Sequence, residues 1–187
     1  SVLTGPQTQQ HLAAGFEIGT RFHSAPVKRL ADARPMHLGH AVEADGRWRL
    51  FAFAGAEPPA GPSAIRALCD FLAEGPASPM RRFTPAGADP DAVIDLRAVF
   101  QQDHRTLEVE AMHPFLLPRK GRHGLKDYEK MFCADPEAGD IFDMRGIDRA
   151  RGCMVAVRPD QHVAHVLPLN DFDALAAFFG GFMIARR

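Results

Sequence analysis

The sequence predicts an α/β fold in which helices flank a mixed β-sheet. Two stretches lead to this prediction: a strand–helix–strand order over residues 47–100, and a hairpin followed by a helix over residues 153–182. A β-α-β unit demands a parallel strand pair with a right-handed crossover, whereas a hairpin adds antiparallel strands. The 187 residues are enough for one domain of ordinary size.

The first predicted strands form a hairpin over residues 38–55. Leu38–Ala44 and Arg47–Gly55 flank an Asp45-Gly46 pair, and glycine readily adopts the positive φ of a type I′ turn. Residues 1–37 show little periodicity, and we expect them to be an extended linker from a preceding domain. The folded domain is therefore predicted to span residues 38–187.

A helix is predicted after the proline-rich loop of residues 56–63, with Ser63 as its N-cap and Gly75-Pro76 at its end. Apolar residues recur at i, i+3, i+4 and i+7 on one face of this helix. They are Ile65, Leu68, Cys69 and Leu72. Residues 76–91 are predicted to form a loop.

The second half of the chain is predicted to begin with a buried strand at residues 92–100 and a short one at 106–110. Residues 111–141 are irregular. Cys153–Val157 and His162–Leu167 then form a hairpin, in which Pro159 suits a type I turn. Asn170 or Asp171 caps a last helix, whose apolar face is predicted to be Leu175, Phe178, Phe179 and Phe182.

This order matches a thioredoxin-like fold in which the irregular residues 101–141 replace the usual second helix. A thiol catalyst of that fold needs a cysteine just after the first core strand, at a helix N-terminus. The loop at residues 55–63 contains no cysteine, and the chain has no CxxC motif. Cys69 is predicted to be an inert core thiol and Cys153 to pack in a strand, whereas Cys133 lies in the irregular segment without a predicted role. The odd number of cysteines favours a reducing, cytoplasmic compartment.

Other site classes have weak or missing signals. His37 and His40, like His162 and His165, are three residues apart, which places them on opposite faces of a strand, so no metal site is predicted. No GxGxxG or P-loop motif occurs, so no cofactor site is predicted in this chain. A net charge of −1 argues against nucleic acid or an anionic membrane as partner, and no apolar run is long enough for a membrane span.

Charged residues surround the last predicted hairpin. We interpret them as a structural polar rim that fixes where residues 142–149 dock, with Arg158 able to pair with Asp143 or Asp148. A site for an anion made by the arginines is the alternative, but nearby aspartates would repel an anion. The rim residues are Asp143, Arg145, Asp148, Arg149, Arg158 and Asp160.

Two stretches carry a family resemblance, residues 19–55 and 142–169. The pattern D-x-R-G-I-D-R…V-R-P-D-Q-x-V-A, from Asp143 to Ala164, and A-D-G-R-W-R, from Ala44 to Arg49, are its most specific parts. The chain resembles the C-terminal domain of flavin-dependent phenol hydroxylases, particularly enzymes like 3-hydroxybenzoate 4-monooxygenase. The resemblance extends from about Leu3 to Phe182.

The resemblance implies that the complete enzyme uses FAD and NADPH to add one oxygen atom to a phenolic ring. It also implies that flavin and substrate lie in upstream domains, and that this domain is thioredoxin-like, redox-inactive and associated with homodimerisation. No catalytic or flavin residue transfers to this chain, because the motifs of the FAD domain are not in these 187 residues. Two alternatives stay open: a free-standing thiol oxidoreductase, and a small module that binds aromatic ligands.

Overall fold

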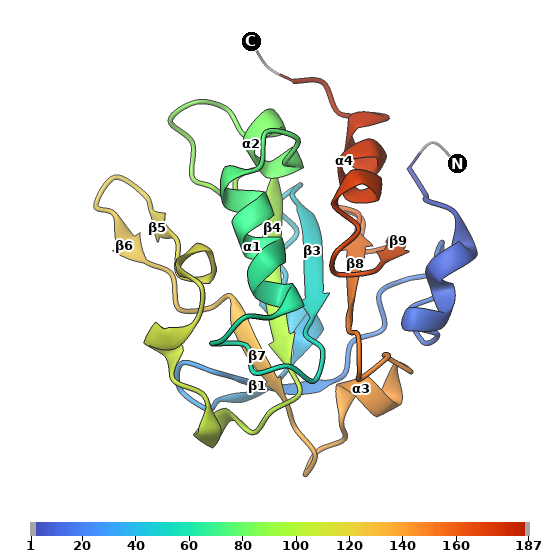
Figure 1. Ribbon diagram of the computed structural model, residues 1–187, viewed down its shortest axis with the longest axis vertical. Helices are drawn as coiled ribbons and strands as arrows, with labels where there is room; N and C mark the ends of the chain where they lie inside the picture. Colours follow the sequence, from blue (N-terminus) through green and yellow to red (C-terminus); the bar gives the residue numbers. More distant parts are fainter. Residues whose placement is uncertain (1–2, 186–187) are drawn as a thin grey trace.

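The computed structural model describes residues 3–185, and its centre is a seven-stranded sheet in the order β2-β1-β7-β4-β3-β8-β9 (Figure 1). The strands are β1 (Pro26–Arg29), β2 (Pro35–His37), β3 (Trp48–Phe53), β4 (Ile94–Phe100), β7 (Met131–Ala134), β8 (Cys153–Val157) and β9 (Val163–Leu167). β4 runs parallel to β3 and β7, and the other neighbouring pairs are antiparallel. This mixed sheet, with its thioredoxin-like order β4-β3-β8-β9, confirms the predicted fold class.

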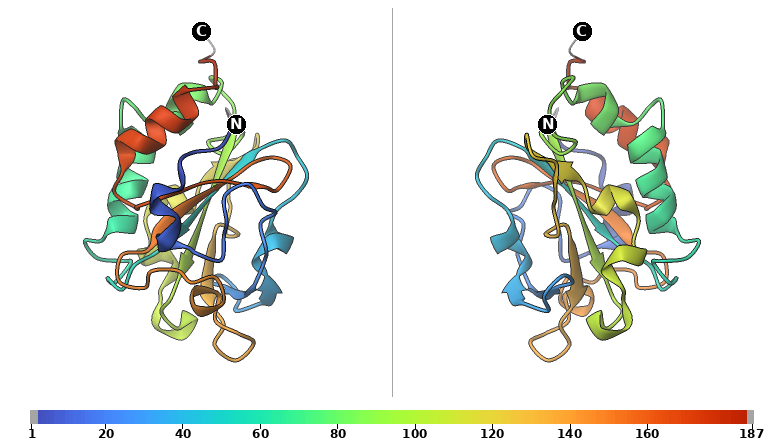
Figure 2. Two further views of the ribbon diagram at one scale, coloured as in Figure 1. Left: turned by 90° about the vertical axis from the view of Figure 1, so that its right-hand side faces the viewer. Right: turned by 90° about the vertical axis from the view of Figure 1, so that its left-hand side faces the viewer.

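Three helices cover one face of the sheet, as Figure 2 shows in side view. They are α1 (Ala64–Glu74), α2 (Pro79–Phe83) and α4 (Phe172–Gly180). Trp48, at the start of β3, packs against α4 and the residues after it, with ring centroids 5.4 Å from Phe179 and 5.0 Å from Phe182. All six residues of β3 are buried, because strands flank it on both sides and chain covers both of its faces.

The opposite face of the sheet is covered by the N-terminal segment and by α3 (Ile141–Met144). Phe22 stacks between Phe16 and Phe51, with centroid distances of 4.6 Å to each. Phe53 meets Phe142 of α3 edge to face at 5.8 Å. Aromatic pairs of this kind stabilise a core beyond the apolar area that they bury.

The segment predicted as an extended linker, residues 1–37, is packed into the domain over its described part. It supplies strands β1 and β2, and Leu12 and Phe16 are each 1% exposed. It also lies along the edge of β9, where the Gly19 nitrogen donates to the Val163 oxygen at 2.8 Å. The sequence pattern did not indicate this because the strands are only four and three residues long.

Most of the strongly patterned elements are confirmed. In α1 the predicted face is buried and the helix ends before Gly75. β4 and β8 lie where they were expected, and the turn between β8 and β9 is closed by Gln161 N donating to Arg158 O at 2.8 Å. Asp171, rather than Asn170, caps α4 by accepting a bond from Ala174 N. These elements are long or strongly periodic, which makes their type readable from sequence.

The predicted hairpin over residues 38–55 is wrong. Leu38–Ala41 is a 3-10 helix, not a strand, and β3 pairs with β4 and β8 instead. Gly46 does adopt a positive φ of 80°, but Asp45 does not, so the predicted type I′ turn is not formed either. Both edges of β3 are occupied by strands from later in the chain, which leaves no edge for residues 38–44.

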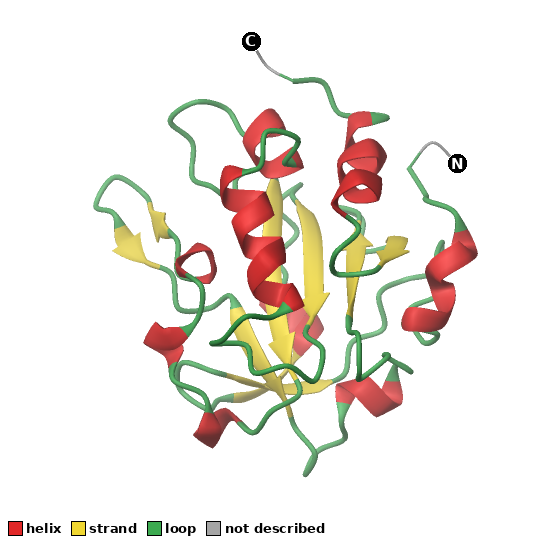
Figure 3. Ribbon diagram, viewed as in Figure 1, coloured by secondary structure: helices red, strands yellow, loops and turns green. Residues whose placement is uncertain are grey.

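Three further differences lie between residues 76 and 141 (Figure 3). Residues 76–91, predicted as a loop, contain α2, and residues 106–110, predicted as a strand, lead into a 3-10 helix. β7 lies inside the stretch predicted as irregular. The remaining short elements are η1 (Gln7–Leu12), η2 (Leu38–Ala41), η3 (His104–Thr106), η4 (Val109–Ala111), η5 (Pro114–Leu116), β5 (Arg119–Lys120) and β6 (Leu125–Lys126).

Within residues 3–185, no helix has both the length and the apolar character that crossing a bilayer requires.

Candidate functional site

The loop after β3 is the first place to look for chemistry, because a thiol catalyst of this fold would carry its nucleophile there. In this chain a carboxylate occupies the N-terminus of α1 instead. Glu57 Oε2 accepts a hydrogen bond of 2.7 Å from the backbone nitrogen of Ala64. Ser63 stands at the predicted N-cap position, but its hydroxyl donates to the Gly61 oxygen at 3.2 Å and does not cap the helix. The helix end that would stabilise a thiolate thus already binds an anionic side chain of the same loop.

The segment that faces this loop packs against it closely. Gly152 has a φ of 65°, and a Cβ at this position would lie 2.1 Å from the Phe53 oxygen. A Cβ on Gly55 would lie 2.7 Å from the Ala150 oxygen. Gln101 joins the two segments, since its Nε2 donates to Ala54 O at 3.2 Å and to Arg149 O at 2.7 Å. Backbone of residues 150–152 therefore packs directly on the start of the loop, whereas a hollow of about 250 Å³ stays open beside Glu57 and Ala64.

The three cysteines lie outside this loop, although Cys153 is the strand partner of Phe53 at the end of β3, and each is fully buried and forms no disulfide. Burial raises the pKa of Cys69 to about 12 and that of Cys133 to about 12, and it raises the pKa of Cys153 further still. A thiol with such a pKa is almost entirely protonated at neutral pH, and the thiolate is the nucleophile. None of the three is placed for thiol–disulfide exchange.

The residues predicted as a polar rim divide into two groups. Around α3, Arg149 pairs with Asp143 at 2.9 Å and with Asp140 at 2.8 Å. Arg145 Nη2 donates to the Ser24 oxygen at 2.8 Å, so it ties α3 to the N-terminal segment. Asp148 accepts from the backbone of Ala150 and Arg151, each at 3.0 Å.

The second group of rim residues lies at the β8–β9 turn. Arg158 pairs with Asp160 of the same turn. The pairing of Arg158 with Asp143 or Asp148 that the sequence allowed is not formed. Because the rim arginines are bound to aspartates or to a backbone oxygen, the structure offers no open group of cations for an anion there.

The histidine pairs do not form a metal site in the described part of the chain. No cluster of three or more His, Cys, Asp or Glu side chains with the geometry for an ion occurs among residues 3–185. The rings of His37 and His40 lie 5.6 Å apart. His162 is bonded to the oxygen of Asp160, whereas His165 is 4% exposed and packs beside Phe178.

A buried ionic network is the main feature that sequence analysis missed. Asp95, on β4, is fully buried and binds three cations. Its Oδ2 lies 3.0 Å from Arg49 Nε and 2.9 Å from Arg97 Nε, and its Oδ1 lies 2.5 Å from Lys130 Nζ. Lys130 also contacts Asp91. The network joins β3, β4 and the residue before β7, so it stabilises the parallel part of the sheet.

Further charges surround the network. Burial favours the neutral form of Asp91, but hydrogen bonds from Lys120 and Lys130 lower its pKa to about 2. The sequence does contain a sign of this network, because Arg49 and Asp95 each stand inside a strand whose other residues are mostly apolar. In the structure the two residues are direct partners in the parallel pairing of β3 with β4. A buried charge inside a strand indicates a buried charge of opposite sign nearby.

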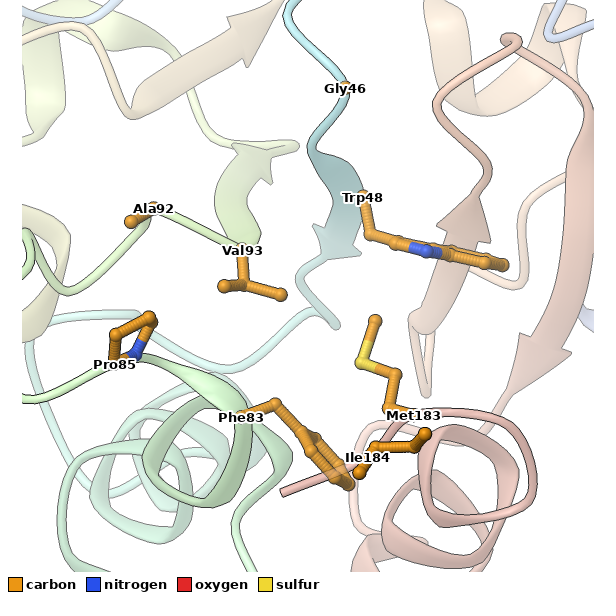
Figure 4. Close-up of a pocket in the computed structure, with 8 residues that line it drawn as sticks. All are labelled: Gly46, Trp48, Phe83, Pro85, Ala92, Val93, Met183 and Ile184. Carbon is orange, nitrogen blue, oxygen red and sulfur yellow. The ribbon is translucent and has the colours of Figure 1, made fainter. Parts of the chain in front are cut away.

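An apolar hollow lies at the opposite end of the sheet from the Glu57 loop, where β3 and β4 begin (Figure 4). Its volume is about 410 Å³. We call it the Trp48 hollow, and the side chains and backbone that line it are Gly46, Trp48, Phe83, Pro85, Ala92, Val93, Met183 and Ile184.

Comparison with known proteins shows to which family this chain belongs. The model of the family described as "Phenol hydroxylase, C-terminal dimerisation domain" matches residues 1–187. This chain belongs to that family.

Two curated relatives extend the likeness of this dimerisation domain. It is 55% identical over 188 residues to 3-hydroxybenzoate 4-monooxygenase from Comamonas testosteroni, and 29% identical over 181 residues to the FAD-dependent monooxygenase terD from Aspergillus terreus. These alignments cover 99% and 94% of the chain. The chain spans only 29% of the length of each relative.

Among solved structures, the dimerisation domain is similar to the thioredoxin domain of a thiol-disulfide oxidoreductase from Bacteroides vulgatus. The TM-score is 0.51 with 11% identity, and the match covers 87% of this chain and 98% of that one. At this identity the likeness concerns the fold alone. The dimerisation domain is therefore thioredoxin-like in architecture, with a carboxylate and no cysteine in the loop after β3.

Proposed function

We propose that this chain is the redox-inactive C-terminal domain of an FAD- and NADPH-dependent aromatic hydroxylase, and that it joins two copies of that enzyme into a homodimer. In this proposal the flavin and the phenolic substrate bind in preceding domains, to which the N-terminal segment leads. The 55% identity to 3-hydroxybenzoate 4-monooxygenase over nearly the whole chain supports this parent enzyme. The odd number of free cysteines suits a reducing, cytoplasmic compartment.

The proposal that this domain is redox-inactive rests on the carboxylate of Glu57 at the N-terminus of α1. A thiol oxidoreductase needs an accessible thiolate at this position, and the chain has neither a cysteine in the loop nor an exposed one among the described residues. The alternative of a free-standing oxidoreductase therefore has no group to perform the reaction. In our proposal the rim from Asp143 to Asp160 has a structural role, because its ion pairs hold α3 and the β8–β9 turn in place.

The test has two measurements on the chain. Light scattering after gel filtration measures its mass in solution, and we expect twice the 20.5 kDa of one copy. Reduction of a disulfide substrate by dithiothreitol, with and without the chain, measures thiol activity, and we expect no acceleration. A monomer at every concentration would refute the homodimer. Acceleration that one cysteine-to-serine change abolishes would refute the redox-inactive role.

A further inference from the structure

We propose that two copies of this chain pair through the Trp48 hollow, with Ile184 of each copy entering the hollow of the other. This inference rests on the proposed homodimer and names the surface that forms it. It places the interface at the end of the sheet where β3 and β4 begin, far from the Glu57 loop (Figure 1).

The hollow has the character of a pocket for an aliphatic side chain. The side chains that line it are all apolar, and the two largest, Trp48 and Phe83, are 8% and 5% exposed. Figure 4 shows Val93 and Met183 directed into the same space, with Ile184 beside Phe83. An apolar cavity of roughly 150 Å³ already admits benzene, so a hollow of about 410 Å³ has room for a branched side chain.

Ile184 is the matching group. It is 88% exposed, more than any other large hydrophobic side chain among the described residues. It follows α4 on a short segment and lies at the rim of the hollow. A twofold interface uses the same patch on both copies, so a projecting group and the pocket that receives it must both belong to one patch. Ile184 and the Trp48 hollow meet this condition.

Other surfaces of the domain are less suited to association of two copies. The edge of β9 is covered by residues 19–22, whose backbone bonds to Val163 and Gln161. The edge strand β2 has three residues and begins with Pro35, which has no N–H to donate. Leu125 is 70% exposed on the β5–β6 hairpin, but it does not line the Trp48 hollow.

The first experiment measures the dimer dissociation constant by sedimentation equilibrium for the unmodified chain, for Ile184→Asp and for Leu125→Asp. We expect Ile184→Asp to weaken the dimer at least about a hundredfold, because both copies lose a buried side chain and gain a charge in an apolar pocket. Leu125→Asp is the matched control, since it places the same charge at another exposed aliphatic residue, and it leaves the constant within about threefold. Circular dichroism checks that each variant is folded.

The second experiment tests directly whether residue 184 of one copy lies in the Trp48 hollow of the other. Chains carrying Ala92→Cys are mixed with chains carrying Ile184→Cys under mild oxidation, while the three native thiols stay buried. We expect disulfide-linked heterodimers between the two variants, and none when Leu125→Cys replaces Ile184→Cys.

The outcomes separate this inference from the homodimer itself. If Ile184→Asp dimerises as tightly as the unmodified chain, or the mixed variants do not cross-link, the Trp48 hollow is not the interface, although the homodimer stands. If the unmodified chain does not associate, both proposals are overturned.

Discussion

Glu57 Oε2 lies 2.7 Å from the backbone nitrogen of Ala64, the first residue of α1. This bond joins the loop after β3 to the helix that covers the sheet. It places a negative charge at the positive end of the helix dipole, and it satisfies a backbone donor that the helix itself cannot satisfy.

Glu57→Gln should destabilise the domain by about 0.5–1 kcal/mol, because a charge-assisted cap is replaced by a weaker neutral one. Ser63→Ala, which would normally remove a cap, should cost only a few tenths of a kcal/mol, since the Ser63 hydroxyl does not cap α1. Urea denaturation monitored by circular dichroism measures both changes. Glu17→Gln is the control, because the Glu17 side chain makes no contact of this kind. A larger loss for Ser63→Ala than for Glu57→Gln would contradict the assignment.

Lys130→Met should cost about 3–5 kcal/mol, because it leaves the buried carboxylates of Asp91 and Asp95 without their shared cation. Lys126→Met makes the same chemical change at a more exposed pair with Glu110, and it should cost much less than Lys130→Met. Equal losses in urea denaturation would show that the network around Asp95 contributes no more than a surface pair.

His165 should make the domain less stable as the pH falls below about 6.5. Burial lowers the pKa of His165, although Asp171 opposes this in part. The unfolded chain therefore takes up a proton near pH 6.5 that the folded chain resists, so stability falls with pH by up to about 1.4 kcal/mol per pH unit.

His165→Phe removes this group and should flatten the dependence below about pH 6.5. The exposed His11 serves as the control, because its replacement by phenylalanine makes the same chemical change and leaves His165 in place. Parallel curves for the His165→Phe variant and the unmodified chain would disprove the role of His165.

Cys69, Cys133 and Cys153 should not react with Ellman's reagent at pH 8 while the chain is folded. All three are fully buried, and burial raises each thiol pKa well above this pH. After unfolding in guanidinium chloride all three should react within minutes. Absorbance at the thionitrobenzoate band gives the count, and rapid reaction of even one thiol in the folded chain would show that our account of its burial is wrong.

Several features of the fold, the loop after β3 and the family could be predicted from the amino-acid sequence alone. The 3.6-residue period of Ile65, Leu68 and Leu72 predicts α1 and its buried face, and the mostly apolar stretch at residues 92–100 predicts β4. The missing cysteine after β3 predicts a redox-inactive loop, and the motifs between Asp143 and Ala164 predict the family, which comparison confirms. Each of these signals is contained in a short stretch of chain, so no knowledge of distant contacts is needed.

Only the tertiary structure decided which segments meet. β7 is four residues long, and residues 38–44 form no strand because both edges of β3 were already taken by β4 and β8. The pairing of Asp95 with Lys130, and the meeting of Ile184 with the Trp48 hollow, join residues far apart in sequence. Local preference sets the type of a long periodic element, whereas competition for strand edges and the need to pair buried charges are settled by the whole chain at once.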